Sequence, residues 1–279
     1  MGQAEDYLKK TVAEALTEDL GLAGDVTSQA IMPENLLGEA VIVAKEPGVV
    51  AGLFVAEAVF HALDADTDFD ARVEDGDEVE PDQIVARLSG NLLSILSCER
   101  VALNFLAHLS GIATVTREYV LVAARHGAAI KDTRKTTPGL RPLEKYAVLV
   151  GGGTNHRFGL YDAVLIKDNH IAAAGGIAKA VELVRENLEE ALPIEVETET
   201  LEQVEEALRV GADIIMLDNM DVAEITAAVA LIDGRAEVEV SGGVTMDNLA
   251  LKAAAGPDFI SVGAITQSAP AFDFSLIVS

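Results

Sequence analysis

The residues best suited to bind anions gather in one stretch of the chain. Seven of the 20 Lys and Arg residues fall between residues 131 and 167, where only three acidic residues occur, although the whole chain has a net charge of −26. A cationic cleft in an anionic protein concentrates small, negatively charged ligands. The clustered basic residues are Arg134, Lys135, His156, Arg157 and Lys167.

These cations could instead pair with the many carboxylates of an acidic surface. We assign Lys145 to that role because it lies inside a helical pattern. The two arginines and two lysines of the clusters each follow or border an apolar run, which places them at strand ends or in adjoining loops. We therefore predict that these four side chains bind a ligand.

Two acidic residues end neighbouring strands of the pattern. Glu197 lies in the run IEVET, and Asp218 lies in IMLDN. Facing a cationic cleft, they suit the hydroxyls of a ribose or Mg²⁺, which favours a few carboxylates plus substrate phosphate oxygens. Either residue could instead cap the following helix. We expect Glu195 and Glu197 to face in different directions, with Glu197 at the site.

Glycine-containing turns follow the last two strands, at residues 241–245 (SGGVT) and 261–264 (SVGA). Barrels of alternating strands and helices often bind phosphate through backbone N–H groups in these loops, where glycine allows a close approach. Glycine is also ordinary in turns, so this signal leaves both interpretations open.

His156 and His170 flank the strand that carries Lys167. A zinc site would need a third neutral ligand, and the surrounding cations argue against a metal there. We predict instead that His156 hydrogen-bonds a carboxylate of the ligand. No Ser, Cys or Lys has the surroundings of a covalent nucleophile, so catalysis should depend on charge placement and orientation.

The pattern of elements changes near residue 129. Before it, a helix (about 4–16), a strand (38–45), a helix (53–63) and a hairpin-like stretch (71–90) predict an α/β sandwich, and residues 92–126 read as helix with a break at residues 110–111. After it, six apolar strands each precede a helical segment, which predicts a parallel β/α barrel smaller than the eightfold kind, closed or nearly closed. The predicted domains are residues 1–108 and 109–279. The predicted site residues come at the carboxyl ends of the strands, where barrels place their active sites.

Composition excludes several classes of protein. An acidic chain of 279 residues with net charge −26 does not suit general binding to nucleic acid or to anionic membranes. Its single cysteine, Cys98, allows no internal disulfide and no thiolate zinc cluster. No apolar run reaches membrane-spanning length and the start does not resemble a signal peptide, so we expect a cytoplasmic protein. The excess of acid suggests adaptation to high salt.

Several runs of residues resemble quinolinate phosphoribosyltransferases. They are ERVALNFLAHLSGIAT, DTRKTTPGLR, LYDAVLIKDNH, IEVETETLEQVEEAL, IIMLDN, VSGGVT and ISVGAITQS, and the resemblance extends from about Glu18 to the C-terminus. It implies an N-terminal sandwich followed by an open β/α barrel. It also implies the transfer of phosphoribosyl from phosphoribosyl pyrophosphate to quinolinate with decarboxylation, in homodimers with shared sites or in hexamers.

The resemblance also implies roles for individual residues. Quinolinate carboxylates would be held by Arg134, His156, Arg157 and Lys167, with Arg100 reaching in from the other subunit. Phosphoribosyl pyrophosphate and its Mg²⁺ would be handled by Lys135, Glu197 and Asp218, and these three with Lys167 would be the catalytic residues. The remaining substrate contacts would come from Thr133, Ser241, Gly242, Gly243, Val262, Gly263 and Ala264. Gln267 departs from the family, whose members often carry a basic residue there, and this puts one phosphate contact in doubt.

Three other functions fit parts of the sequence. A phosphoribosyltransferase of the same fold could act on another aromatic acid, although the number of cations favours a dicarboxylate. The hairpin around Gly76 resembles that of biotinyl carriers, but it lacks the lysine that a carrier needs at its tip. An aldolase-type barrel could use Lys167 as a Schiff base, but the neighbouring Asp168 and Arg157 weaken that alternative.

Overall fold

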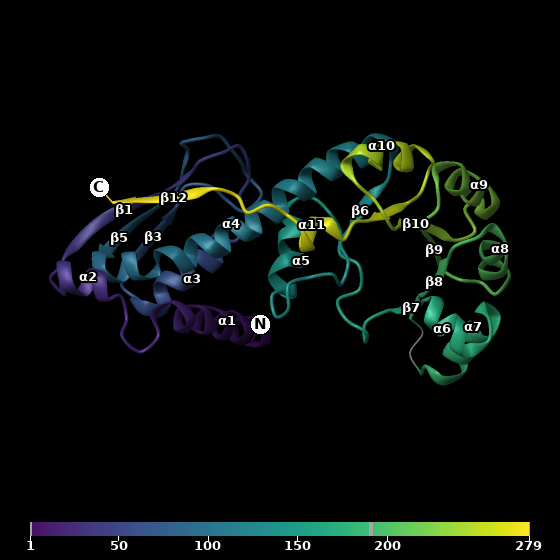
Figure 1. Ribbon diagram of the computed structural model, residues 1–279, viewed down its shortest axis with the longest axis horizontal. Helices are drawn as coiled ribbons and strands as arrows, with labels where there is room; N and C mark the ends of the chain where they lie inside the picture. The colour runs from purple at the N-terminus through teal and green to yellow at the C-terminus, as the bar shows by residue number, and fades with distance from the viewer. Residues whose placement is uncertain (1, 190–191, 279) are drawn as a thin grey trace. The chain divides into compact units, whose positions relative to one another are not determined.

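The computed structural model describes residues 2–189 and 192–278 of the chain, which form two compact units (Figure 1). The first unit comprises Met1–Thr114 and Ala269–Ser279, and the second comprises Val115–Ser268. This division differs from the boundary expected after residue 108, because the end of the chain returns to the first unit. The predicted class, an α/β fold with an N-terminal sandwich and an open barrel, is confirmed.

The first unit packs helices against an antiparallel sheet of order β12-β1-β5-β3. These strands are β1 (Leu37–Ala44), β3 (Asp68–Ala71), β5 (Ile84–Asn91) and β12 (Phe274–Val278), and a small second sheet pairs β2 (Gly48–Val49) with β4 (Glu78–Val79). The helices are α1 (Gly2–Leu20), α2 (Val26–Ile31), α3 (Leu53–Leu63) and the first part of α4 (Leu92–Ala123). In α3, Val55, Val59 and Phe60 recur at helical spacing and are buried, so this helix has one apolar face.

Strand β12 lies beside β1 in antiparallel register, with Ala40 opposite Val278 and Ala44 opposite Phe274 (Figure 1). The sequence predicted residues 109–279 as one domain. Pairing between strands this far apart along the chain is a long-range contact that a local pattern does not encode. The C-terminal strand therefore belongs to the sheet of the first unit.

Helix α4 runs without interruption through residues 110–111, so the predicted break there is wrong. Gly111 is required by packing, because a Cβ at this position would lie 2.0 Å from the carbonyl oxygen of Pro270. The hydroxyl of Ser110 accepts a hydrogen bond from the backbone N of Ala51 at 2.9 Å. The helical segment Leu92–His126 is long and apolar enough to cross a membrane, and half of its most apolar window is buried within the fold, as in the core helix of a globular protein.

The second unit is a parallel sheet of six strands in the order β6-β11-β10-β9-β8-β7. The strands are β6 (Ala129–Lys131), β7 (Val164–Ile166), β8 (Ile194–Thr198), β9 (Ile214–Asp218), β10 (Glu237–Ser241) and β11 (Phe259–Ser261). All six predicted strands are present. Consecutive strands β6 and β7 lie at opposite edges of the sheet, so the barrel is open between them.

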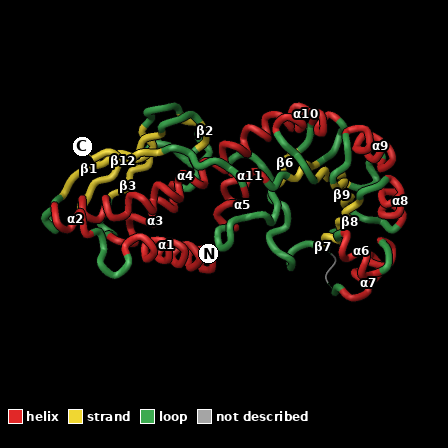
Figure 2. Tube along the Cα trace, in the orientation of Figure 1, coloured by secondary structure: helices red, strands yellow, loops and turns green. Residues whose placement is uncertain are grey.

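Helices follow the strands and line the outside of the arc that the strands form (Figure 2). They are α5 (Arg141–Val150), α6 (Asp168–Ala174), α7 (Ile177–Asn187), α8 (Leu201–Arg209), α9 (Val222–Ile232), α10 (Met246–Ala254) and the short α11 (Ala264–Gln267), with a 3₁₀ turn η1 (Ala124–His126) after α4. Val196, Ile215 and Val240 are wholly buried, as expected for strands covered by helices. Parallel strands under this cover bring their carboxyl ends to one rim.

Candidate active site

A cavity of about 590 Å³ opens at the carboxyl ends of the barrel strands. Its walls come from the ends of β7, β9, β10 and β11, from the residues that follow these strands and β6, and from the segment between α5 and β7. Most of the predicted site residues border it, namely Thr133, Arg134, Lys135, His156, Arg157, Lys167, Asp218, Ser241, Gly242, Gly243, Val262, Gly263 and Ala264. These predicted residues therefore share one cavity.

Two arginines, Arg134 and Arg157, border the cavity without an ion pair to a described carboxylate. Among the described residues, none of the ion pairs within 4.0 Å includes Arg134, Lys135 or Arg157. Burial, together with the nearby charge of Arg134, lowers the pKa of Arg157. Like charges held together in a protein with a large excess of carboxylates indicate a site whose counter-ion is the ligand.

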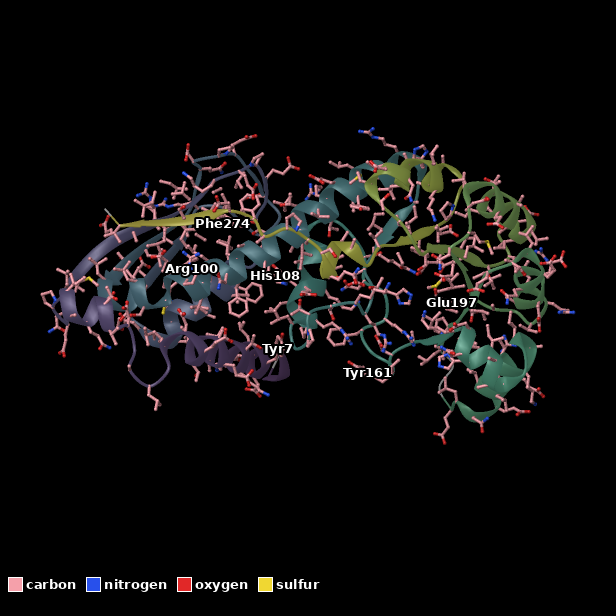
Figure 3. The ribbon with its side chains drawn as sticks, in the orientation of Figure 1. Tyr7, Arg100, His108, Tyr161, Glu197 and Phe274 are labelled. Carbon is pink, nitrogen blue, oxygen red and sulfur yellow. The ribbon has the colours of Figure 1, made fainter. Side chains whose placement is uncertain are left out.

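Lys167 has a different arrangement. Its ammonium lies 2.5 Å from a carboxylate oxygen of Glu197, and its side chain is 44% exposed while that of Glu197 is 8% exposed. This pair joins the end of β7 to the end of β8. Glu197 itself does not border the cavity and reaches it through Lys167; it is labelled among the barrel side chains in Figure 3.

The two loops that carry Arg134 and Arg157, on either side of α5, are held by interior polar contacts. Arg141 donates to the carbonyl oxygens of Phe158 (3.0 Å) and Arg134 (3.3 Å), and so ties two parts of the cavity wall together. Lys145 is 2.6 Å from Asp132, and neither side chain is more than 2% exposed. The prediction that Lys145 pairs on the surface is therefore wrong: helix α5 turns this side chain inward.

The Asp132–Lys145 pair fixes the main chain at His156. Asp132 accepts a hydrogen bond from the backbone N of His156 at 2.7 Å, and Lys145 donates to the carbonyl oxygen of His156 at 2.9 Å. A buried ion pair whose remaining hydrogen-bonding capacity is used in this way is costly to break. The floor of the cavity thus rests on buried charges that the sequence pattern did not distinguish from surface charges.

The His156 ring lies between two buried carboxylates. Its Nε2 is 3.1 Å from Glu195 and 3.4 Å from Glu239, and its Nδ1 accepts the backbone N–H of Arg157 at 2.7 Å. Burial opposes a charged ring, but the two carboxylates outweigh it and raise the pKa of His156 to about 9. A charged ring carries a proton on both nitrogens, so the contact in which Nδ1 accepts the N–H of Arg157 belongs to the neutral ring, whose single proton is then on Nε2. His170 does not join this group, since its Nδ1 accepts the backbone N–H of Lys167 at 2.9 Å.

Glu195 and Glu197 both face inward, so the expectation that they face in different directions is wrong. Residues two apart on a strand share a face, because side chains alternate with a period of two. Glu195 contacts His156 inside the barrel, and Glu197 contacts Lys167 at the rim. Burial raises the pKa of Glu195.

The alternative role of Glu197 and Asp218 as helix caps does not apply. Thr200 caps α8, and Asp221 caps α9 by accepting from the backbone N of Glu224. Asp218 instead ends β9 at the cavity, where the Asn219 side-chain amide donates to it at 2.7 Å. Two carboxylates on adjacent strands beside an anion cavity are a donor set that fits Mg²⁺ only when a ligand supplies further oxygens.

The loop after β10 has a backbone that only glycine adopts easily. Gly242 and Gly243 have φ angles of 84° and 58°, and a Cβ on Gly242 would lie 2.2 Å from Oδ1 of Asn219. In the loop after β11, a Cβ on Gly263 would lie 3.0 Å from Cδ of Lys135. Both loops therefore bring bare backbone to the cavity wall.

The cavity also contains Leu165, Met216 and Asn219, which the sequence did not single out as binding residues. Val244, Thr245 and Ser261, which lie in the two predicted phosphate turns, and Gln267, at the position of the doubtful phosphate contact, border it as well. Asn219 could have been suspected because it follows Asp218, and Thr245 because it precedes a helix. Arg100 lies on α4 in the first unit, with a side chain that is 63% exposed (Figure 3).

Comparison with known proteins matches both parts of the chain to the domains of one family. Residues 25–110 match the family described as quinolinate phosphoribosyl transferase, N-terminal domain, and residues 112–277 match its C-terminal domain. The chain is 48% identical to a probable nicotinate-nucleotide pyrophosphorylase (carboxylating) of Synechocystis sp., covering 94% of this chain and 89% of the relative. It is 44% identical to the protein of the same name from Bacillus subtilis, covering 98% and 93%.

Solved structures support the same family assignment. The nicotinate-nucleotide pyrophosphorylase of Francisella tularensis has a TM-score of 0.94 and 41% identity, covering 98% of this chain and 96% of that one. The fold and the cavity thus define a phosphoribosyltransferase with an open β/α barrel. The chain belongs to the quinolinate phosphoribosyltransferase family.

Proposed function

We propose that this protein transfers the phosphoribosyl group of phosphoribosyl pyrophosphate to the ring nitrogen of quinolinate and releases CO₂. The products are nicotinate mononucleotide, pyrophosphate and CO₂, in the biosynthesis of NAD. The observation that carries this proposal is that Arg134 and Arg157 both border the cavity and that neither forms an ion pair within 4.0 Å with a described carboxylate. A flat dicarboxylate supplies the missing negative charge, and arginine forks grip carboxylates in a bidentate manner.

The two sides of the cavity suit the two substrates. Arg134, Arg157 and Lys167 lie on the side proposed for the quinolinate carboxylates, with His156 beneath them. The loops after β10 and β11 present backbone to the side proposed for the phosphates, as glycine-containing loops do in other barrels. The residues proposed to contact the phosphates are Thr133, Lys135, Ser241, Gly242, Gly243, Val262, Gly263 and Ala264.

The proposed chemistry needs no protein nucleophile. The pyridine nitrogen displaces pyrophosphate from C1 of the ribose. The 2-carboxylate then leaves as CO₂, its bonding electrons stay on C2 beside the cationic ring nitrogen, and C2 takes up a proton from solvent. Fixed cations hold both anions in the orientation needed for reaction and stabilise the charges that develop, which supplies most of the catalysis in these steps. Mg²⁺, held by Glu197 and Asp218 together with the donor, would neutralise the leaving pyrophosphate.

We also propose a homodimer in which Arg100 of one subunit completes the site of the other, with a hexamer as the alternative assembly. The exposed position of Arg100 on α4 supports this proposal. The net charge of −26 supports operation at high salt, where screening weakens the repulsion among carboxylates.

Pyrophosphate release is the direct test of the proposed function. Purified protein receives phosphoribosyl pyrophosphate and Mg²⁺ with quinolinate, with nicotinate, or with no acceptor. The proposal requires release that depends on quinolinate, with equimolar nicotinate mononucleotide and CO₂. Release with nicotinate alone would favour a transferase for another aromatic acid, and trapping of Lys167 by borohydride with a carbonyl substrate would favour the Schiff-base alternative.

A further inference from the structure

Lys252 is a buried lysine beneath the cavity that the proposed function has not used. It lies on α10, is 7% exposed, and donates to the carbonyl oxygens of Gly242 (3.2 Å) and Met220 (3.4 Å). No carboxylate lies within 4.0 Å of its ammonium among the described residues. Burial lowers the pKa of Lys252, although the charge of Asp218 opposes this. A lysine this deeply buried is rare without a paired acid, so it calls for a role.

The contact with Gly242 orients the next amide group. A trans peptide is planar, so the carbonyl of Gly242 and the N–H of Gly243 point in opposite directions. Because the carbonyl points to Lys252, the N–H points away from it, on the side where both glycines border the cavity. Within the described chain this N–H donates to no protein acceptor. It is therefore free to donate to an anion in the cavity.

Neighbouring contacts hold the same loop. The side-chain amide of Asn248 donates to the carbonyl oxygen of Gly243 at 2.8 Å, and the backbone N of Asn219 donates to the carbonyl oxygen of Ser241 at 3.0 Å. Through Met220, Lys252 also reaches the segment that follows Asp218. One ammonium thus links the loops after β9 and β10, which carry the proposed metal and phosphate contacts.

We propose that Lys252 is a positioning residue for the phosphorylated substrate. Lys252 turns the Gly242–Gly243 peptide so that the N–H of Gly243 faces the bound phosphate. The positive charge of Lys252 lies behind the same loop. The identity of the substrate in this inference rests on the proposed function. The binding of an anion by the loop does not depend on that function. If Lys252 only fastened α10 to the barrel, its loss would lower stability without distinguishing between substrates.

The main test compares the two Michaelis constants in Lys252→Met, which keeps the length of the side chain and removes its charge and donors. The KM for phosphoribosyl pyrophosphate should rise by about tenfold, as expected for one lost charged hydrogen bond, while the KM for quinolinate changes by less than about twofold. Lys252→Arg keeps the charge and the donors and should recover most of the loss. An equal rise in both constants, or no rise in either, would overturn the inference.

Two other lysines provide matched controls. Lys179→Met makes the same change on the surface of α7, where Lys179 pairs with exposed Glu182 at 2.6 Å, and it should leave both constants unchanged. Lys145→Met removes a buried lysine on the other side of the cavity and should raise the KM for quinolinate more than that for the donor. The opposite responses of Lys145→Met and Lys252→Met would separate positioning from a general loss of stability.

A binding measurement separates this inference from the proposed function. Calorimetry with inorganic pyrophosphate as the probe needs no turnover, so it remains informative if quinolinate proves not to be the acceptor. The wild type should bind pyrophosphate about tenfold more tightly than Lys252→Met, and Lys179→Met should bind like the wild type. If Lys252→Met does not fold, Lys252→Gln, which removes the charge and retains an amide NH₂ group, replaces it. Wild-type affinity for pyrophosphate in a folded neutral variant would refute the role of Lys252.

Discussion

The ammonium of Lys167 lies 2.5 Å from the carboxylate of Glu197, at the ends of the neighbouring strands β7 and β8. This contact joins a residue proposed to hold the acceptor to one proposed to hold Mg²⁺ with the donor. Removing either partner would leave the other without its closest counter-charge, and Glu197 is largely buried. The two halves of the site are therefore coupled at this pair, whereas no ion pair within 4.0 Å joins Arg134 or Arg157 to a described carboxylate.

We expect Arg134→Ala and Lys167→Ala each to abolish turnover of quinolinate while the fold persists. Loss of a charge-assisted hydrogen bond to a desolvated carboxylate should cost about 2–5 kcal/mol of transition-state binding. Steady-state kinetics measures the effect, and circular dichroism checks the fold. Arg185→Ala, which removes an exposed guanidinium that binds the carbonyl oxygens of Val210 and Gly211, is the control. Near-normal kcat/KM in either cavity variant would mean that the acceptor pocket is wrongly placed.

Mg²⁺ should bind together with phosphoribosyl pyrophosphate and not to the free protein. Two carboxylates on separate strands make a poor cage for an ion that dehydrates reluctantly, and the pyrophosphate supplies the missing oxygens. Calorimetry in buffer with enough salt to screen the acidic surface should show negligible heat for Mg²⁺ alone and saturable binding once the donor is added.

Asp218→Asn is the cleaner variant for this test, because Glu197→Gln also frees Lys167. It should weaken binding of Mg²⁺ with the donor more than binding of quinolinate. Tight binding of Mg²⁺ by the free protein that disappears in Glu197→Gln would instead reveal a preformed metal site.

Mixing two inactive variants tests whether subunits share their sites. Arg100→Ala and Lys135→Ala should each be inactive, but a mixed dimer contains one site with both residues intact. Activity should therefore reappear after subunit exchange, at one of the two sites in each mixed dimer. Exchange is verified with differently tagged subunits, and a mixture that stays inactive after verified exchange would place Arg100 in the site of its own subunit.

Glu239 should make stability depend on acid pH. Burial opposes its ionised form, but His156 and Lys131, whose ammonium lies 2.8 Å away, outweigh burial and lower the pKa of Glu239 to about 2. A carboxyl with a lower pKa in the folded state stabilises the fold above its unfolded pKa and loses that contribution as pH falls towards the folded value. The Tm of the wild type should thus fall more steeply than that of Glu239→Gln between about pH 5 and pH 2.

Glu237→Gln is the control for this measurement, because Glu237 is exposed on the same strand. Its Tm should follow the wild type across the range. Parallel curves for the wild type and Glu239→Gln would show that Glu239 is not held ionised by its neighbours.

The sequence by itself determined the barrel, its six strands and most of the cavity. Short apolar strands alternating with helices leave little choice but parallel pairing, and a parallel sheet brings the residues after each strand to one rim. Arg134, Lys167 and Asp218 could therefore be placed from their positions alone.

Only the tertiary structure decided which charges are buried and which partners they have. Lys145 and Lys252 have the same local pattern as surface lysines, and their burial depends on what packs against α5 and α10. The inward direction of Glu195 follows from strand periodicity, but its contact with His156 joins residues far apart along the chain. The return of β12 to the first unit and the continuity of α4 at Gly111 likewise depend on contacts distant in sequence, whose energies no local pattern records.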